Sequence, residues 1–428
     1  MSGFWSSPIV RIGLIILLIG LLDVYTFRGI KTLISSLSPF WRRSISWSYL
    51  GLHLLFWGTL VYLGVTFSTG GRPPIMVLRA FSIAVVLMYL PKLFFIVPLL
   101  IEDGVRIARA GGGAALKWMA IVPQETPVWA ERRKFVSMLS MAIAAIPFSG
   151  ILHGVTVGKY NFTVRRKTLH FPDLPTEFDG FTITQISDIH VGSFDDPEAV
   201  RKGIELVNAQ KSDLLVFTGD MVNNEAKEME PWKSDFAKLK APYGKLSVFG
   251  NHDYGDYIAW PSHEAKAQNL KRLAEIHGEL GFRLLRNEHQ VIEKNGQQLA
   301  VAGVENWGQP PFPQFGDLDR AIEGLPADVF TVLLSHDPTH WDEKTRHHTH
   351  PFALTLAGHT HGMQMGIEIP GFRWSPVKLR YPRWADLYQE AGRMLYVNRG
   401  FGYLGFPGRV GIWPEITVLE LRKGTAVV

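Results

Sequence analysis

The chain has 428 residues, 46% of them hydrophobic, which exceeds the usual size of one compact domain, so we expect two parts. Lys and Arg outnumber Asp and Glu by 44 to 39, and the net charge of +5 is too small to indicate nucleic-acid binding by itself. Cysteine is absent, which excludes disulfides, thiol nucleophiles and thiolate metal sites, so any metal must bind nitrogen and oxygen ligands.

Four long apolar stretches predict a membrane module over residues 1–154. A helix that crosses a bilayer needs about 20 mostly apolar residues, and each stretch reaches or approaches that length. Buried soluble helices are the alternative, which four such stretches in one short region disfavour. The third contains Pro91 and Pro98, and we expect it to kink, to lie partly in the interface or to begin late. The stretches are Ile9 to Phe27, Trp47 to Phe67, Ile75 to Ile101 and Phe135 to Gly154.

Basic residues in the loops predict the orientation of this module. The loops after the first and third stretches carry four and six Lys or Arg residues, whereas the other side carries Arg11, Arg72 and Arg79. Because basic loops stay in the cytoplasm, we expect a multi-pass protein of the inner (cell) membrane with its C-terminal part on the extracytoplasmic side. Before the fourth stretch, Arg132-Arg133-Lys134 resembles a twin-arginine export signal, and a membrane-flanking charge cluster is an equally good interpretation with the same topology.

The remainder predicts a connector over residues 155–179, with one early strand, and an α/β domain over residues 180–428. Short runs rich in β-branched residues and bounded by Gly or Asp are typical of buried strands. Strands that alternate with helices indicate a sheet whose carboxyl ends carry the function. The expected strands are Phe181–Ser187, Leu214–Thr218, Leu246–Phe249, Leu299–Ala302, Phe330–Leu334, Ala353–Ala357, Met394–Asn398 and Ile416–Leu421. The expected helices are Asp196 to Asn208, Met229 to Lys240 and Ser262 to Glu279.

Five polar blocks each follow one of these expected strands. Taken singly, each block is equally well a turn, a helix cap or an ordinary polar histidine. In this fixed order, one sheet could bring them all to a single rim. Carboxylate, imidazole and amide groups gathered there suit two hard or borderline metal ions, the arrangement that phosphate ester hydrolysis uses. The blocks are Asp188-Ile-His190, Gly219-Asp220, Gly250-Asn251-His252-Asp253, Ser335-His336 and Gly358-His359-Thr360-His361.

From about Gly180 to the C-terminus, these blocks resemble the signature of the calcineurin-like metallophosphoesterase superfamily. The stretches Leu395-Tyr-Val-Asn-Arg-Gly400 and Pro414-Glu-Ile-Thr417 resemble its membrane-anchored or exported bacterial branch, which includes phosphodiesterases and pyrophosphatases. The resemblance implies an α/β (α+β) four-layer sandwich, here preceded by an α-helical transmembrane module. It also implies two divalent metal ions, with Mn, Fe or Zn expected.

The resemblance also implies a role for each block residue. Asp220 would bridge the two metals, because a shared carboxylate offsets the repulsion of cations roughly 3.5–4 Å apart. A hydroxide held between the metals would then attack phosphorus. The expected ligands are Asp188, His190 and His361 at the first metal and Asn251, His336 and His359 at the second.

Two residues of the third block are expected to act in catalysis. His252 would protonate the leaving oxygen or stabilise the transition state, while Asp253 either orients that ring or acts as a structural cap. The second block continues to Asn223, where many relatives have another Asp. This departure puts a role for Asn223 as an acid in doubt, and Asn224 is a candidate substitute as a hydrogen-bonding group.

The segments around the last block predict the substrate side of the site. Aromatic and basic residues over Ile367 to Tyr388 would cover an anionic head group or lie against the bilayer surface, and ordinary surface packing is the alternative. The glycine-rich stretch at residues 400–411 is expected to form a wall of the cleft, with Arg399 or Arg409 binding a phosphate. We interpret the cluster of His340, His347, His348 and His350 as a polar surface loop rather than an accessory metal site.

Together these features favour a phosphodiesterase or pyrophosphatase that acts on a phosphorylated envelope substrate, possibly lipid-linked, at the lipid bilayer. The alternatives are a general exported phosphohydrolase for soluble esters, or a transporter or membrane scaffold whose metal domain is vestigial. We expect no nucleic-acid partner, and the sequence does not define an oligomeric state.

Overall fold

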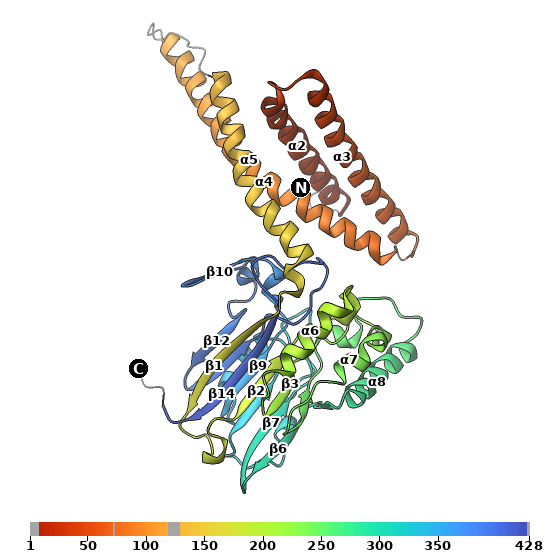
Figure 1. The fold of residues 1–428 in the computed structure, drawn as a ribbon, viewed down its shortest axis with the longest axis vertical. Helices are drawn as coiled ribbons and strands as arrows, with labels where there is room; N and C mark the ends of the chain where they lie inside the picture. The colour runs from red at the N-terminus through yellow and green to blue at the C-terminus, as the bar shows by residue number, and fades with distance from the viewer. Residues whose placement is uncertain (1–7, 72, 119–128, 426–428) are drawn as a thin grey trace. The chain divides into compact units, whose positions relative to one another are not determined.

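The computed structural model describes residues 8–71, 73–118 and 129–425, and the chain divides into two compact units. Unit 1 comprises Met1–Leu152 and unit 2 comprises His153–Val428. Unit 1 is helical, whereas unit 2 contains all the strands of the described residues (Figure 1).

Unit 1 contains helices long and apolar enough to cross a membrane, as predicted. The four candidate spans are Gly13–Ile34, Pro39–Ser68, Ile75–Ala108 and Glu131–Thr156. The third begins where expected and continues through Pro91 and Pro98 as one helix of 44 residues. Arg72, one of the charges that predict the orientation, lies outside the described residues. The helices are α2 (Pro8–Ile34), α3 (Pro39–Ser68), α4 (Ile75–Trp118) and α5 (Trp129–Thr156). The last turn of α5, from His153 on, belongs to unit 2.

A buried polar network links three helices of unit 1. Lys92 Nζ of α4 lies 2.6 Å from Asp23 Oδ1 of α2 and 2.6 Å from His53 Nε2 of α3. Tyr89 donates a hydrogen bond to the other oxygen of Asp23. Because an unpaired charge in apolar surroundings is costly, this network holds α2, α3 and α4 together in one arrangement.

Unit 2 is built on two mixed six-stranded sheets. The first sheet has the order β1-β14-β2-β3-β4-β5, and the second has the order β12-β13-β9-β8-β7-β6. The strands of the first sheet are β1 (Thr163–Phe171), β14 (Glu415–Lys423), β2 (Thr182–Ile186), β3 (Leu214–Phe217), β4 (Lys245–Ser247) and β5 (Arg283–Leu284). Those of the second are β12 (Asp386–Glu390), β13 (Arg393–Val397), β9 (Phe352–Ala357), β8 (Thr331–Leu334), β7 (Gln297–Gly303) and β6 (Glu288–Lys294).

Alternating apolar side chains produce four layers. In β3, Leu215 and Phe217 pack with the helices α6 (Pro197–Asn208) and α8 (His263–Glu279), whereas Leu214 and Val216 pack against the second sheet. The far face of the second sheet is covered by short helices, including α9 (Leu318–Ala321) and α10 (Thr339–Glu343). Since successive side chains of a strand point to opposite faces, central strands such as β3 and β8 are buried on both sides, and their sequences are continuous apolar runs.

The expected strands are present, and one expected helix differs. Met229 to Lys240 was expected to be a single helix, but the structure has a 3-10 helix, η4 (Ala226–Trp232), followed by the four-residue α7 (Lys233–Phe236). Pro231 lies at the junction and lacks the N–H that a continuous α-helix needs. The segment assigned to the connector carries β1, which pairs in parallel with β14 along its whole length.

Candidate metal centre

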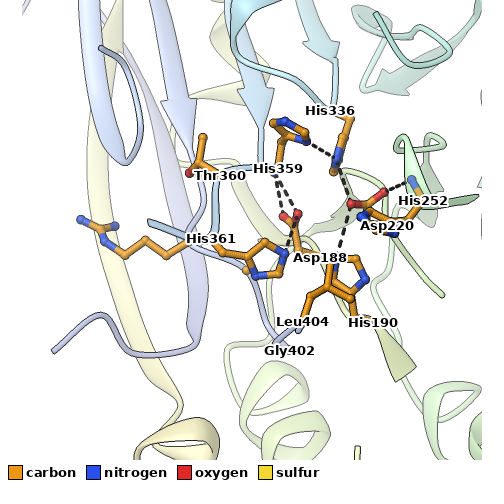
Figure 2. Close-up of polar contacts among 12 residues, drawn as sticks. Asp188, His190, Asp220, His252, His336, His359, Thr360, His361, Gly402 and Leu404 are labelled. Carbon is orange, nitrogen blue, oxygen red and sulfur yellow. Dashed lines mark hydrogen bonds and ion pairs between the residues drawn. The ribbon is translucent and has the colours of Figure 1, made fainter. Parts of the chain in front are cut away.

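The five polar blocks lie at the carboxyl ends of strands, but on two sheets rather than one. β2, β3 and β4 of the first sheet are parallel to one another, as are β8 and β9 of the second. The ends of parallel strands meet at one edge of a sheet, and because the two sheets pack face to face, the side chains from both edges converge on one site, as Figure 2 shows for Asp188, Asp220, His336 and His359. The expectation of a single sheet is therefore wrong, because it ignored pairing between distant segments. The blocks follow Ile186, Phe217, Ser247, Leu334 and Ala357, where β2, β3, β4, β8 and β9 end.

The backbone bends sharply where the side chains enter the site. Five of the seven expected ligands adopt a left-handed conformation, which costs about 1–3 kcal/mol per residue when glycine is absent. Hydrogen bonds between loops hold these turns, including His190 N–H to the Asp220 carbonyl at 3.1 Å. Such strain concentrates at functional sites. The residues and their φ angles are Asp188 (51°), His190 (48°), Asp220 (62°), His359 (71°) and His361 (50°).

The first group of ligand atoms comes from Asp188, His190 and His361, whose donor atoms all lie within 4.8 Å of one another. All three side chains are buried. Neither ring nitrogen of His190 makes a hydrogen bond, and Nε2 of His361 makes none either. A buried polar atom without a partner is costly, so this group is suited to a cation that accepts nitrogen ligands.

The second group comes from Asp220, His336 and His359, again with donor atoms within 4.8 Å. Asn251 Oδ1 lies 2.8 Å from His359 Nδ1, which places the amide oxygen beside this group. Asp220 Oδ2 lies 3.2 Å from His336 Nε2 and also 3.4 Å from His190 Nε2 of the first group. One carboxylate oxygen therefore reaches both groups, the position that a bridging ligand needs.

The carboxylates favour positive charge at this place. Burial opposes the charged form of His336, but the negative charge of Asp220 outweighs burial and raises the pKa of His336 to about 10. Burial likewise opposes ionisation of Asp220, yet the charge of His336 holds its pKa well below the usual range. Divalent cations meet the same electrostatic requirement, and the nitrogen and oxygen donors are those that Mn, Fe and Zn accept.

Neighbouring groups orient the histidine rings. His336 Nδ1 lies 2.7 Å from the Thr218 carbonyl, which accepts its proton and leaves Nε2 facing Asp220. His359 Nε2 lies 2.8 Å from the Tyr381 hydroxyl and 3.5 Å from Asp337 Oδ2, so Nδ1 faces the site. Such outer contacts fix the tautomer and direction of a ligand ring. The sequence did not indicate that Tyr381 and Asp337 would orient a ligand histidine, although Asp337 directly follows the fourth block.

Two glycines in the blocks leave room for ligand carboxylates. A Cβ on Gly250 would lie 2.2 Å from Asp220 Oδ1, and one on Gly358 would lie 2.3 Å from Asp188 Oδ2. Real Cβ atoms do not approach oxygen this closely, so both positions require glycine.

His252 lies beside the two groups, in a different setting from the ligands. Its Nδ1 lies 2.8 Å from the Asn223 carbonyl, and its ring stacks on Tyr257 with 4.3 Å between centroids. Burial lowers the pKa of His252 to about 4. The proton on Nδ1 is thus committed to a backbone acceptor, which leaves Nε2 available, and Asn223 contributes through its backbone rather than as an acid.

The hydrogen bonds of the Asp253 carboxylate come from backbone N–H groups rather than from the His252 ring. The donors are the N–H groups of Asp220 (2.9 Å), Met221 (2.8 Å) and Gly250 (2.8 Å). Burial, reinforced by the charge of Asp220, raises the pKa of Asp253 to about 7. Of the two expected roles, these hydrogen bonds fit the structural cap, because they join the backbone of the second block to that of the third.

Arg399 and Arg409 are fully buried, which contradicts the expectation that they bind substrate. Arg399 pairs with Glu415 at 2.5 Å and with Glu368 at 2.7 Å. Arg409 donates to the carbonyls of Gly402 and Arg399 at 2.5 and 2.8 Å. Both guanidinium groups support the turn after β13, so their charge is used within the protein.

Two of the four histidines at 340–350 are buried and hydrogen-bonded, so the cluster as a whole is not the polar surface loop that was expected. His340 is buried and lies 2.8 Å from Ser335 Oγ, and the buried His350 lies 2.9 Å from Thr331 Oγ1. Exposed positions such as His347 alternate with these buried ones. Within residues 8–71, 73–118 and 129–425, the only Asp, Glu and His groups placed to hold a metal are the two described above.

Comparison with known proteins now identifies the family. A family model described as "Calcineurin-like phosphoesterase" matches residues 181–363, and one described as "Probable Calcineurin-like phosphoesterase, transmembrane domain" matches residues 7–159. The "Uncharacterized metallophosphoesterase YkuE" of Bacillus subtilis is 33% identical over 256 residues, which cover 58% of this chain and 82% of YkuE. The chain belongs to the calcineurin-like metallophosphoesterases.

Two further relatives share this metallophosphoesterase region. "Phosphodiesterase YaeI" of Escherichia coli is 27% identical over 68% of this chain and 98% of its own length. The "Transmembrane protein with metallophosphoesterase domain" of Danio rerio is 26% identical over 58% of this chain and 55% of its own length. The predicted superfamily, the four-layer fold and the hydrolase class are therefore confirmed, and the four apolar helices belong to a membrane protein.

Proposed function

We propose that this metallophosphoesterase uses two divalent metal ions, of Mn, Fe or Zn, to hydrolyse a phosphodiester or pyrophosphate bond in a membrane-associated, lipid-linked substrate. The observation that carries the proposal is the pair of Asp and His groups that meet at Asp220 Oδ2. The four candidate spans on the same chain keep this site close to a bilayer.

Each group has the donors for one cation. Asp188, His190 and His361 would hold the first, Asn251, His336 and His359 the second, and Asp220 both. When bound, two such cations supply an activated water nucleophile and neutralise charge on the phosphoryl oxygens. The protein residues fix the position of this chemistry. The strained turns and the contacts of the histidine rings hold each donor atom in one orientation.

His252 is the residue that would assist departure of the leaving group. The bond from Nδ1 to the Asn223 carbonyl and the stack on Tyr257 fix the ring plane. With its proton on Nδ1 and a pKa of about 4, the ring leaves Nε2 unprotonated, and a proton taken up there would serve the leaving oxygen or hydrogen-bond to the phosphoryl group.

The experiment that tests this function compares two substrate types. We would reconstitute the purified full chain with Mn, Fe or Zn and assay bis-p-nitrophenyl phosphate against a lipid-linked pyrophosphate in mixed micelles. We expect kcat/KM to be at least about tenfold higher for the lipid, a transition-state preference of about 1.4 kcal/mol. Asp220→Asn is the matched control and should be inactive on both. Equal or higher kcat/KM for the soluble ester would replace this function with that of a general phosphohydrolase.

We also propose that unit 2 lies on the extracytoplasmic side of the inner membrane. The basic loops after the first and third apolar stretches support this sidedness. Because the chain has no cysteine, a single cysteine at the exposed Glu198 of α6 can report it. An impermeant maleimide should label this cysteine in intact spheroplasts, and labelling only after lysis would place unit 2 in the cytoplasm.

A further inference from the structure

A short hairpin in unit 2 exposes an apolar face. Its strands are β10 (Ile367–Ile369) and β11 (Phe372–Trp374), and Ile367 lies opposite Trp374 while Ile369 lies opposite Phe372. Residues opposite each other share a face of the sheet, so these four side chains form one surface. Their exposed fractions are 51% (Ile367), 58% (Ile369), 52% (Phe372) and 43% (Trp374).

The opposite face of the hairpin is ionic and turned toward the protein. Glu368 pairs with the buried Arg399 and with Arg165, each at 2.7 Å. Its cross-strand neighbour Arg373 pairs with Asp386 at 3.0 Å. This is the reverse of an ordinary surface hairpin, which buries its apolar face and solvates its polar one. A one-residue change of register would break these ion pairs, so the apolar face is held outward.

The hairpin starts close to the end of the fourth candidate span. The last turn of α5 belongs to unit 2, and there the Gly154 carbonyl accepts a hydrogen bond from Arg409 N–H at 3.1 Å. The next residue, Val410, accepts one from Gly366 N–H at 2.9 Å, and Ile367 follows directly. Each strand is only about 10 Å long, so the whole apolar face lies near the point where the chain leaves the span.

We propose that the face formed by Ile367, Ile369, Phe372 and Trp374 inserts into the interfacial region of the lipid bilayer. Exposed apolar patches on a soluble surface mark interaction sites, and here the adjoining span supplies the apolar phase. Trp is favoured at the membrane interface. Leu379, which is 90% exposed, follows five residues after the hairpin with the exposed Lys378 and Arg380 on either side in the sequence, and such cations suit anionic head groups.

The test uses fluorescent labels on the full chain in liposomes. Because the native chain has no cysteine, Phe372→Cys gives one site for an environment-sensitive dye. Phe315→Cys is the matched control, since Phe315 is exposed to 53% against 52% for Phe372 and lies on another segment. We expect a blue-shifted emission for the dye at position 372, quenching by brominated lipids and protection from iodide. The dye at position 315 should respond to iodide and not to brominated lipids.

Two results would overturn the proposal. One is a dye at position 372 that iodide and brominated lipids affect to the same extent as the dye at position 315. The other is formation of disulfide-linked dimers of Phe372→Cys under oxidising conditions, which would assign the face to a second copy of the chain. Ile369→Cys provides an independent reporter on the same face if Phe372→Cys does not fold. Both readouts are independent of catalysis, so they decide membrane contact whatever the substrate is.

Discussion

Replacing Asp253 by alanine is expected to damage the metal centre through the backbone. The buried carboxylate accepts three short hydrogen bonds, from the N–H groups of Asp220, Met221 and Gly250. Each buried N–H group left without a partner costs about 1–3 kcal/mol, so the free energy of unfolding should fall by at least about 3 kcal/mol. A domain is typically stable by about 5–15 kcal/mol, so unit 2 remains folded but with a loosened site.

Asp253→Ala should lower the metal content of the protein as well as its stability. Asp220 holds a left-handed backbone conformation with φ of 62°, and one of the lost bonds restrains its own N–H group. We would measure metal per chain by mass spectrometry and the thermal unfolding midpoint of the detergent-purified protein. Asp253→Ala should lower both. The matched control is His252→Ala, which removes the neighbouring ring without touching these three bonds. It should retain both quantities while kcat falls by roughly 10²–10⁴-fold.

An opposite pattern would refute this reasoning. If Asp253→Ala kept its metal content and unfolding midpoint while losing kcat, the carboxylate would take part in the chemistry. The assignment of Asp253 as a structural cap would then be wrong.

Three further substitutions test other parts of the structure. Gly250→Ala would place a Cβ 2.2 Å from Asp220 Oδ1 and should abolish activity. The control Gly278→Ala, whose Cβ would have no atom within 4 Å, should remain active. An active Gly250→Ala would contradict the close approach of Gly250 to Asp220. Burial lowers the pKa of His277 to about 3, so protonation of the unfolded state should reduce stability as pH falls from about 6.5 toward 3, by up to about 1.4 kcal/mol per pH unit. The unfolding midpoint of the native chain should therefore fall more steeply between pH 6.5 and 5 than that of His277→Gln, and equal slopes would contradict this. Lys92→Met leaves the buried Asp23 carboxylate without its ammonium partner, with Tyr89 and His53 still beside it, which should cost about 3–5 kcal/mol in the detergent stability of unit 1. An unchanged stability would show that the network is dispensable.

Local patterns in the sequence predicted much of the fold. The run Leu214–Phe217 is a buried strand, and Asp196 and Ser262 cap the helices that follow them, as short-range rules indicate. The five blocks were recognised because each one follows such a strand, and their order carried the resemblance to the family. The strands, the caps and each block can be read from residues that are close together in the chain, and the order of the blocks can be read directly along it.

Long-range pairing could not be predicted in the same way. The charge of Arg399 is visible in the sequence, but its neutralisation by Glu415 and Glu368 depends on β14 and β10 lying beside it. For the same reason one sheet was expected instead of two. The residues of the strand before Asp220 do not differ in kind from those of the strand before His336, although the two strands belong to different sheets. The outward apolar face of the hairpin also depends on register and on distant ion partners.

The measurement that tests the metal centre most directly is anomalous diffraction from crystals of the Mn-, Fe- or Zn-loaded chain at the absorption edge of the metal. Two peaks should appear in each chain, one among Asp188, His190 and His361 and one among Asn251, His336 and His359, with Asp220 between them. A single peak, or peaks away from Asp220, would contradict a shared two-metal site.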